Sequence, residues 1–387
     1  MKILLIHCHY RLPGGEDAVF AAERALLERH GHTVVVYERS NEEAAHGLAK
    51  LLLPLRAVWN FAAAREVRAL IAREKPDAIH IHNTLLLLSP AVVRAAKQSG
   101  VPVVQSLHNF RLFCPNGILL RECAVCEDCP HKGLSCALRH HCYRGSLLQT
   151  AVVAAAYGLH RRLGTWRGVT VVALTDFDRR KLLEYNRMCP TFDAERLVVK
   201  PNPVCVEPRP ILPWHQRKNQ CLFAGRLEEL KGLPTVLEAW QQLGDTAPDL
   251  LVAGEGPLGE WAKSHAGPKV RFLGQLSPAE LHRHMAESKA VVAASLCYES
   301  FALVPAEAHL LGTPVLASDL GNVGASVQPG IDGLRFAPGD AHALAGAVEA
   351  LHTAAFDCDA IAAAARRTYS EEENYRALLR LYTKEAP

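Results

Sequence analysis

The chain has 387 residues, of which 49% are hydrophobic and 21% charged, a composition typical of a soluble globular protein with two or three domains. The net charge of +3 is too small to indicate nucleic-acid binding, but it permits a weakly basic patch that could rest on an anionic membrane. The apolar runs are shorter than the roughly 20 residues of a membrane-spanning helix, and residues 1–7 do not form a signal peptide. We therefore expect a cytoplasmic protein whose 12 cysteines are thiols or metal ligands rather than disulfides.

The first half of the chain alternates short buried-strand patterns with helical segments. Strands are predicted at 1–7, 33–38, 78–82, 101–108 and 169–175. Between the first two, residues 17–31 carry apolar side chains at helical spacing and end on Gly31, a helix stop. The alternation predicts βαβ units in a parallel sheet, and we place this first domain at residues 1–200.

A proline-rich segment separates the two halves. Residues 201–220 include prolines 201, 203, 208, 210 and 213, a composition that indicates a linker. The alternation then restarts, with strands predicted at 221–227, 249–256, 270–276, 290–296, 313–319 and 333–339. We expect a second α/β domain at 221–365, and a C-terminal helix within 366–387 that packs back on the first domain.

Four motifs of the second half lie at predicted strand ends: AGRLEELKG (224–232), LVAGEGPL (251–258), FLGQLSPAEL (272–281) and ESFALVPAE (299–307). In this order they resemble the family 4 retaining glycosyltransferases of the GT-B fold, over nearly the whole chain. The resemblance implies two Rossmann-like, doubly wound domains that face each other across a cleft. It also implies transfer of a sugar from a nucleoside-diphosphate sugar to a hydroxyl of a glycan or lipid-linked acceptor, in cell-surface polysaccharide synthesis at the cytoplasmic membrane face.

The donor diphosphate needs positive charge, and the second half has no metal-binding DxD motif at a strand end. We therefore expect catalysis without a metal, with cations supplied by the chain. Arg226 and Lys231 lie in a strand-to-helix turn that suits phosphate, although an isolated pair of this spacing could be two solvated surface cations. The resemblance implies that both bind the diphosphate, with the amides of Phe301, Ala302 and Leu303 as further donors.

Two carboxylates frame the apolar run of the last motif. Glu299 is expected in the loop before a helix and Glu307 about two turns inside it. The resemblance implies that Glu299 approaches the donor sugar and that Glu307 accepts the ribose hydroxyls. A favourable position at a helix N-terminus would explain Glu299 but not Glu307.

The first half is expected to supply a glycine turn and a histidine. Gly14 and Gly15 would let backbone amides approach an anion or a sugar. The family usually has Ala and Glu after these glycines, where this chain has Glu16 and Asp17, so which acid matters stays open. An ordinary turn, in which Asp17 only caps the following helix, would be compatible with either acid being the one that matters.

His108 ends a predicted strand, and the resemblance makes it a catalytic-site residue that could donate a hydrogen bond to the donor sugar or to developing charge. His80 and His82 alternate along another strand and so point the same way. We expect His80 to be a core histidine. For His82 the core and the ligand site are equally good interpretations.

An insertion at 109–146 interrupts the alternation and resembles a subgroup of these transferases from bacterial polysaccharide clusters. It holds six cysteines, at positions 114, 123, 126, 129, 136 and 142. Such clustering favours a structural zinc bound by the thiolates of Cys114, Cys126, Cys129 and Cys142. An iron–sulfur cluster, disulfides and unliganded thiols are the alternatives.

Three other functions remain open at the level of the sequence. A nucleotide-sugar epimerase or hydrolase of the same fold would turn over the donor without an acceptor. A non-catalytic binding protein would not need the four charged residues Arg226, Lys231, Glu299 and Glu307. A nucleic-acid module built on the cysteines is weakest, because the insertion lacks a long basic tract with interleaved aromatic residues.

Overall fold

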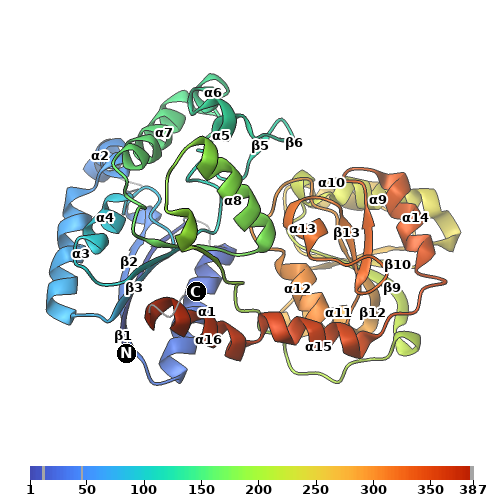
Figure 1. The fold of residues 1–387 in the computed structure, drawn as a ribbon. Helices are drawn as coiled ribbons and strands as arrows, with labels where there is room; N and C mark the ends of the chain where they lie inside the picture. The colour runs from blue at the N-terminus through green and yellow to red at the C-terminus, as the bar shows by residue number, and fades with distance from the viewer. Residues whose placement is uncertain (11–13, 45–46, 384–387) are drawn as a thin grey trace. The chain divides into compact units, whose positions relative to one another are not determined.

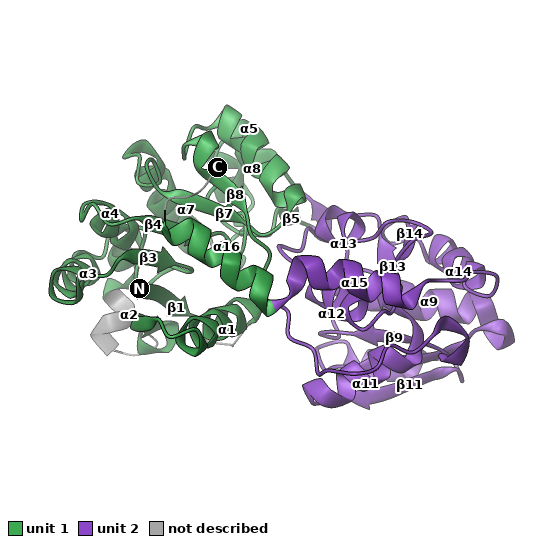
Figure 2. Ribbon diagram, turned by 60° about the horizontal axis from the view of Figure 1, so that its bottom comes forward, with its two compact units in different colours: residues 1–121, 126–203, 371–387 green, residues 122–125, 204–370 purple. Residues whose placement is uncertain are grey.

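The computed structural model describes residues 1–10, 14–44 and 47–383, so Leu12 and Pro13 of the glycine turn lie outside the described residues. The chain folds into two compact units (Figures 1 and 2). Unit 1 comprises residues 1–121, 126–203 and 371–387, and unit 2 comprises residues 122–125 and 204–370. The last segment of the chain thus belongs to the same unit as the first.

Unit 1 is built on a six-stranded parallel sheet with the order β2-β1-β3-β4-β7-β8. Its strands are β1 (Lys2–His9), β2 (Thr33–Ser40), β3 (Ala78–Ile81), β4 (Val103–Ser106), β7 (Thr170–Ala173) and β8 (Leu197–Val199). The central strands are buried on both faces and therefore read as continuous apolar runs in the sequence.

Helices cover both faces of this sheet (Figure 1). They are α1 (Gly15–Arg29), α2 (Gly47–Val58), α3 (Phe61–Glu74), α4 (Ala91–Lys97), α7 (Leu147–Arg162), α8 (Asp176–Met188) and α16 (Glu371–Thr383), with the short turn η1 (Asn41–Ala44) and η2 (Ala194–Arg196) between elements. The insertion contributes β5 (Leu120–Arg121), β6 (Ala124–Val125), α5 (Asp128–Lys132) and α6 (Ser135–Arg139). Helix α16 packs against α1, β3 and β4, where Leu378 and Tyr382 join the core around Leu5 and Val104.

Unit 2 has a second six-stranded parallel sheet, with the order β11-β10-β9-β12-β13-β14. Its strands are β9 (Lys218–Ala224), β10 (Asp249–Ala253), β11 (Val270–Gly274), β12 (Ser288–Ala293), β13 (Val315–Ser318) and β14 (Gly333–Phe336). Its helices are α9 (Leu233–Leu243), α10 (Gly259–His265), α11 (Pro278–Glu287), α12 (Leu303–Leu310), α13 (Gly321–Ala325), α14 (Ala341–Ala350) and α15 (Cys358–Tyr369), with the turns η3 (Trp214–Gln216), η4 (Glu229–Lys231) and η5 (Gly244–Thr246).

The structure confirms the α/β class and the two doubly wound parallel sheets. Each sheet has a point where the strand order reverses, between β1 and β3 in unit 1 and between β9 and β12 in unit 2. In open α/β sheets ligands bind outside the carboxyl ends of the strands at such a point. The loops after these four strands are therefore the places where a ligand site is expected.

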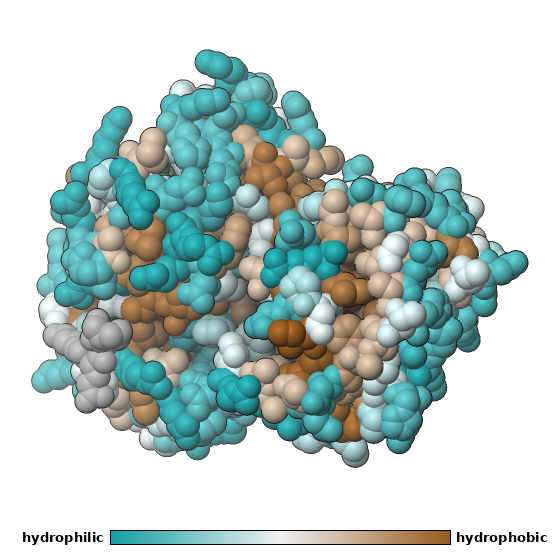
Figure 3. All heavy atoms as spheres, turned by 45° about the vertical axis from the view of Figure 1, so that its right-hand side comes forward, coloured by the Kyte–Doolittle hydropathy of each residue, from teal (hydrophilic) through white to brown (hydrophobic). Residues whose placement is uncertain are grey.

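Among the described residues, no helix combines the length and the apolar character needed to cross a bilayer. The face of the molecule drawn in Figure 3 is largely hydrophilic, with hydrophobic atoms in smaller areas between the polar side chains.

Candidate functional site

In unit 2 a glycine brings two charged loops together at the point where the strand order reverses. Gly232 follows η4 with a positive φ of 73°, and a Cβ at this position would lie 2.0 Å from the carbonyl oxygen of Ala294, just after β12. Only a residue without a side chain fits so close to another backbone. The turn before α9 can therefore lie against the end of β12, which places Lys231 beside Glu299.

Lys231 and Glu299 form an ion pair in which Lys231 Nζ donates to Glu299 Oε1 over 2.8 Å. The hydroxyl of Ser295 donates to the same carboxylate oxygen, and Asn322 Nδ2 donates to the backbone carbonyl of Glu299 over 2.6 Å. Burial disfavours the ammonium of Lys231, but the carboxylate of Glu299 outweighs it and raises the pKa of Lys231. The site thus keeps a partly buried cation and an oriented carboxylate side by side.

Arg226 lies at the same end of the sheet but is much more open to solvent. Its side chain is 61% exposed, and its Nε lies 3.2 Å from Glu228 Oε2. It lines an open pocket with a cavity volume of about 290 Å³ at the ends of β9, β10 and β11. Gly254 lines this pocket too, and a Cβ there would lie 2.0 Å from the carbonyl oxygen of Gly225. An exposed guanidinium beside a pocket lined by backbone atoms is an arrangement that can receive an anionic ligand.

Helix α12 begins later than the sequence indicated. Its first residue is Leu303, so Glu307 lies just over one turn inside the helix, and the expected two turns are wrong because residues 299–302 form a loop. His282 Nδ1 accepts the amide N–H of Glu207, which leaves Nε2 as the protonated nitrogen. This Nε2 lies 3.9 Å from Glu307 Oε1, so Glu307 is placed near a neutral donor rather than a cation of its own.

The start of α12 also shows how the three expected amides are arranged. Leu303 N–H donates to the carbonyl oxygen of Phe301 over 3.0 Å, so this amide is engaged within its own turn. Ala302 is the buried residue that precedes the helix, and the ring of Phe301 meets that of Tyr369 edge to face at 5.9 Å. The loop is therefore held by packing as well as by its backbone.

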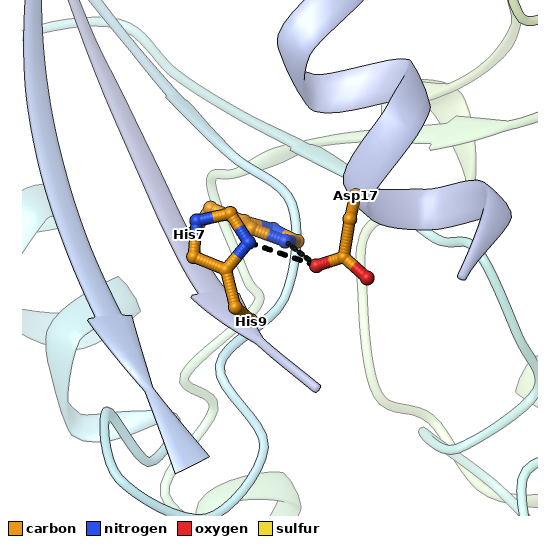
Figure 4. Close-up of side chains that lie close together, drawn as sticks. All are labelled: His7, His9 and Asp17. Carbon is orange, nitrogen blue, oxygen red and sulfur yellow. Dashed lines mark hydrogen bonds and ion pairs between the residues drawn. The ribbon is translucent and has the colours of Figure 1, made fainter. Parts of the chain in front are cut away.

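In unit 1 the glycine turn is bound to the end of β1 by Asp17 (Figure 4). Gly14 is the residue before α1, and its N–H donates to Asp17 Oδ2 over 2.8 Å. Asp17 Oδ1 lies 2.9 Å from both His7 Nε2 and His9 Nδ1. Burial raises the pKa of Asp17, but the hydrogen bonds from His7 and Gly14 outweigh it and keep the carboxyl ionised. Asp17 thus fixes the turn in which Gly15 begins the helix.

Glu16 has a different place from Asp17. It lines a small polar pocket, with a cavity volume of about 20 Å³, together with His108, Arg111 and Tyr157. Burial raises the pKa of Glu16 to about 7, against the opposing effects of the Tyr10 hydroxyl and of Arg111. The sequence left open which of the two acids matters; the structure gives them separate roles, Asp17 in the turn and Glu16 in the pocket.

His108 lies in this pocket and is hydrogen-bonded to His82, with 3.0 Å between His108 Nε2 and His82 Nδ1. Burial lowers the pKa of His108 to about 4, so the ring is neutral at physiological pH. His80 is fully buried and bonded to Tyr382 and Ser106, which confirms it as a core histidine. His82 is both buried and part of the pocket lining.

Sequence reasoning missed two ionisable residues behind this pocket, Glu23 and Lys200. Glu23 is buried in α1 and contacts His82 and Lys200. The signal was present, because Glu23 falls on the same helical face as Val19, Phe20 and the leucines that follow.

Among the described residues, three groups of side chains could hold a metal ion by geometry. They are His7, His9 and Asp17; Glu23, His80 and His82; and Glu127, His131 and Glu184. None of them contains a cysteine, so the four thiols expected to bind zinc are not assembled at ligand distances in the described structure.

The cysteines of the insertion are nevertheless neighbours. The pKa of Cys129 is raised to about 12, mainly by burial and to a smaller extent by the nearby thiols of Cys114 and Cys142. Burial also raises the pKa of Cys114, against hydrogen bonds that its sulfur accepts from the amides of Gly117 and Leu119. The six cysteines of the insertion form no disulfide with one another. The insertion therefore holds two buried thiols, Cys114 and Cys129, near less buried ones. In the described structure these sulfurs lie too far apart for a tetrahedral zinc site.

Comparison with protein families gives two matches that together span most of the chain. Residues 14–203 match a glycosyl transferase 4-like domain, and residues 218–354 match the glycosyl transferases of group 1. The first match covers the sheet of unit 1 except β1, and the second covers all six strands of the sheet of unit 2.

Curated relatives match over part of their length. The chain is 37% identical over 139 residues to a glycogen synthase of Mycobacterium tuberculosis, which covers 34% of this chain and 33% of that protein. It is 37% identical over 136 residues to a phosphatidyl-myo-inositol mannosyltransferase of Mycobacterium leprae, and this match covers 34% of this chain and 36% of that protein. It is 34% identical over 182 residues to a D-inositol 3-phosphate glycosyltransferase of Rhodococcus erythropolis, and this match covers 42% of this chain and 41% of that protein. The chain thus spans about a third of the length of the first two.

Solved structures share the fold over the whole chain. Anabaena Alr3699/HepE in complex with UDP has a TM-score of 0.65 at 18% identity, with 99% of this chain and 100% of that chain covered. The lipopolysaccharide outer core galactosyltransferase WaaB has a TM-score of 0.67 at 14% identity, with both chains covered completely. At these identities the likeness shows the fold alone, which is the GT-B type.

Proposed function

The chain belongs to the group 1 glycosyltransferases, with a glycosyltransferase 4-like domain in its first half, and on this premise we propose that it is a retaining glycosyltransferase. It would move a sugar from a nucleoside-diphosphate sugar to a hydroxyl of a glycan or lipid-linked acceptor. The observation that carries the proposal is the Lys231–Glu299 pair at the point of unit 2 where the strand order reverses, with Arg226 beside a ligand-sized pocket.

Unit 2 has the chemistry for a leaving diphosphate. Lys231 is a cation held by a carboxylate, and the exposed Arg226, which contacts Glu228, would approach a phosphate from the pocket side. Charge that is already in place stabilises a developing anion without reorganisation. With this pair of cations from the protein, catalysis would not need an added divalent metal, and we propose that the nucleotide binds in this unit. HepE, which shares the fold, binds UDP.

The reaction that we propose keeps the anomeric configuration by attack on the face from which the phosphate leaves. The bond between the anomeric carbon and the phosphate oxygen breaks, and the bond to the acceptor oxygen forms. The acceptor proton passes to the leaving phosphate. Glu299 would contact the donor sugar, Glu307 the ribose, and His108 of unit 1 a sugar hydroxyl. The glycine turn at Gly14 and Gly15 would supply backbone amides.

Acceptor binding and membrane contact are proposed for unit 1. The small pocket with Glu16 and Arg111 offers polar groups that suit a single hydroxyl of a saccharide. Large apolar side chains are exposed at Leu55, Phe61 and Leu148, and such residues could support peripheral contact with a membrane that carries a lipid-linked acceptor in polysaccharide synthesis.

A structural zinc in the insertion is a separate proposal. It is supported by the number of thiols and by the backbone amides that donate to Cys114. Four thiolates around zinc are about 3.8 Å apart at Zn–S bonds of about 2.3 Å, so the sulfurs of Cys114, Cys126, Cys129 and Cys142 would have to move closer on binding. Elemental analysis of protein purified under reducing conditions should find about one zinc per chain, and protein without metal would reject the proposal.

A thermal-shift screen tests the proposed function. UDP, GDP and ADP, their sugar conjugates and the matching nucleosides are compared as ligands. One nucleoside diphosphate and its sugar conjugate should stabilise the protein, and the nucleoside alone should do so much less. No stabilisation by any nucleotide would reject the proposal.

A further inference from the structure

A row of buried ionisable side chains lies behind the pocket of unit 1. Glu23 of α1 is 1% exposed, and a buried carboxylate without a partner is strongly disfavoured. Its partner is Lys200, which follows β8 and donates from Nζ to Glu23 Oε1 over 2.6 Å. Lys200 also donates to Asn374 Oδ1 of α16 over 3.3 Å. Lys200 therefore holds one oxygen of Glu23 in place, and Asn374 of α16 holds Lys200.

The other oxygen of Glu23 faces histidines. Oε2 has no hydrogen-bond partner, and neither has His82 Nε2, 3.5 Å away. His80 Nδ1 is 3.6 Å from the same oxygen, but the ring nitrogens of His80 are both engaged, with the hydroxyls of Tyr382 at 2.8 Å and Ser106 at 2.9 Å. The unpartnered carboxylate oxygen and the unpartnered imidazole nitrogen thus face one another.

The proton of His82 belongs on the nitrogen that faces the carboxylate. Burial keeps the pKa of His82 well below its ordinary value, so the ring carries a single proton. With that proton on Nε2, Nδ1 of His82 can only accept. The hydrogen bond between His82 Nδ1 and His108 Nε2 then takes its proton from His108. Nδ1 of His108 is left without a proton.

We infer that Glu23 is a positioning residue for His108. Through His82 it holds His108 as the Nε2–H tautomer, so that Nδ1 of His108 accepts a hydrogen bond from a hydroxyl of the bound sugar. The sequence-based expectation that His108 donates to the sugar is reversed at this nitrogen. The role of the tautomer in sugar binding rests on the proposed function, whereas the tautomer itself rests only on the buried row.

A metal ion is a poor occupant of this row, although Glu23, His80 and His82 are close enough to bind one. The ammonium of Lys200 lies 2.6 Å from Glu23, and a divalent cation would be placed against it in a buried environment. The other ionisable groups around the row are His7 of β1, beside His82, and Tyr382 of α16, beside His80. Glu23 Oε2 has no hydrogen-bond partner, so neither His7 nor Tyr382 donates to it.

The tautomer can be read directly in the wild-type protein. Nitrogen-15 NMR of histidine-labelled protein separates protonated from unprotonated ring nitrogens, and the signals are assigned with the His82→Gln and His108→Gln variants. We expect a protonated Nε2 and a bare Nδ1 in both His82 and His108. A proton on His82 Nδ1, or doubly protonated rings at neutral pH, would overturn the inference. No substrate is present, so this outcome is independent of the proposed function.

Glu23→Gln provides a second test because Lys200 orients the new amide. Its oxygen should stay on Lys200, which turns the NH₂ group toward His82 and makes His82 Nε2 the acceptor. The protons of both histidines should then move to Nδ1, and kcat/KM should fall by about 10- to 100-fold. Tyr382→Phe, which alters only the His80 side of the row, should keep both tautomers and the activity. Unchanged tautomers in a folded Glu23→Gln protein would contradict the inference.

Discussion

Replacement of Lys231 by alanine tests the diphosphate site at its best-defined contact. The ammonium lies 2.8 Å from Glu299, and the two side chains are 32% and 19% exposed. A charge-assisted hydrogen bond to a phosphate contributes about 1.5–3 kcal/mol, which corresponds to a loss of affinity of about 10- to 150-fold. Calorimetric titration should show this loss for the nucleoside diphosphate and no change for the nucleoside alone.

Lys231→Ala also leaves Glu299 without its cation. The resulting loss of stability can be measured separately from the loss of affinity for the diphosphate. Ser295 still donates to the carboxylate, so we expect the folded state to lose only about 1–2 kcal/mol, between the values for exposed and buried pairs. The double variant with Glu299→Gln removes the unpaired charge, and it should regain stability and part of the affinity for the diphosphate.

Lys263→Ala is the matched control, because Lys263 forms an equally short but exposed pair with Glu260 in the same unit. It should change neither stability nor affinity. An equal loss of affinity for the nucleoside and for the diphosphate in Lys231→Ala would refute the reasoning, and so would a diphosphate affinity like that of wild type.

Three further predictions concern other groups of the site. Glu307→Ala should weaken nucleoside binding about 10-fold and abolish any preference for the ribonucleoside over its 2′-deoxy form, measured by titration; a retained preference would reject the ribose contact. Because the pKa of Glu16 is raised to about 7, the folded protein binds more protons than the unfolded chain between about pH 4.5 and pH 7 and loses stability as Glu16 ionises. Glu16→Gln should therefore be more stable than wild type near pH 8, by up to about 3 kcal/mol, and no more stable than wild type near pH 4. Denaturant unfolding at both pH values measures this, and the exposed control variant Glu42→Gln should show no such difference. Transfer activity should persist in a chelator without added Mg²⁺ or Mn²⁺, and its complete loss there would contradict catalysis by protein cations.

The sequence was sufficient for most of the sheet architecture. Strands that are buried on both faces read as continuous β-branched runs, and every strand predicted from such a run is present. Strand β8 was missed because it has only three residues, Leu197–Val199, at the edge of its sheet. The start of α12 was predicted too early, since the loop at 299–302 follows from packing and from the contact of Asn322 with Glu299, which no local pattern encodes.

The site was predictable where it depends on motifs and not where it depends on distant contacts. Lys231 and Glu299 were expected at one sheet edge, and the structure pairs them. Glu23 and Lys200 are separated by 177 positions in the sequence, so only the buried face of α1 hinted at an acid inside the core. The cysteines were expected to converge on one ion; the structure brings them near one another but not to ligand distances.

The central claim is that this chain transfers a sugar from a nucleotide donor to an acceptor hydroxyl. The most direct measurement is the release of nucleoside diphosphate from the sugar conjugate that stabilises the protein, with and without a panel of glycan and lipid-linked saccharide acceptors. The account predicts release that depends on an acceptor and a product that keeps the anomeric configuration of the donor. Equal release without any acceptor would show a hydrolase or epimerase instead and would contradict the account.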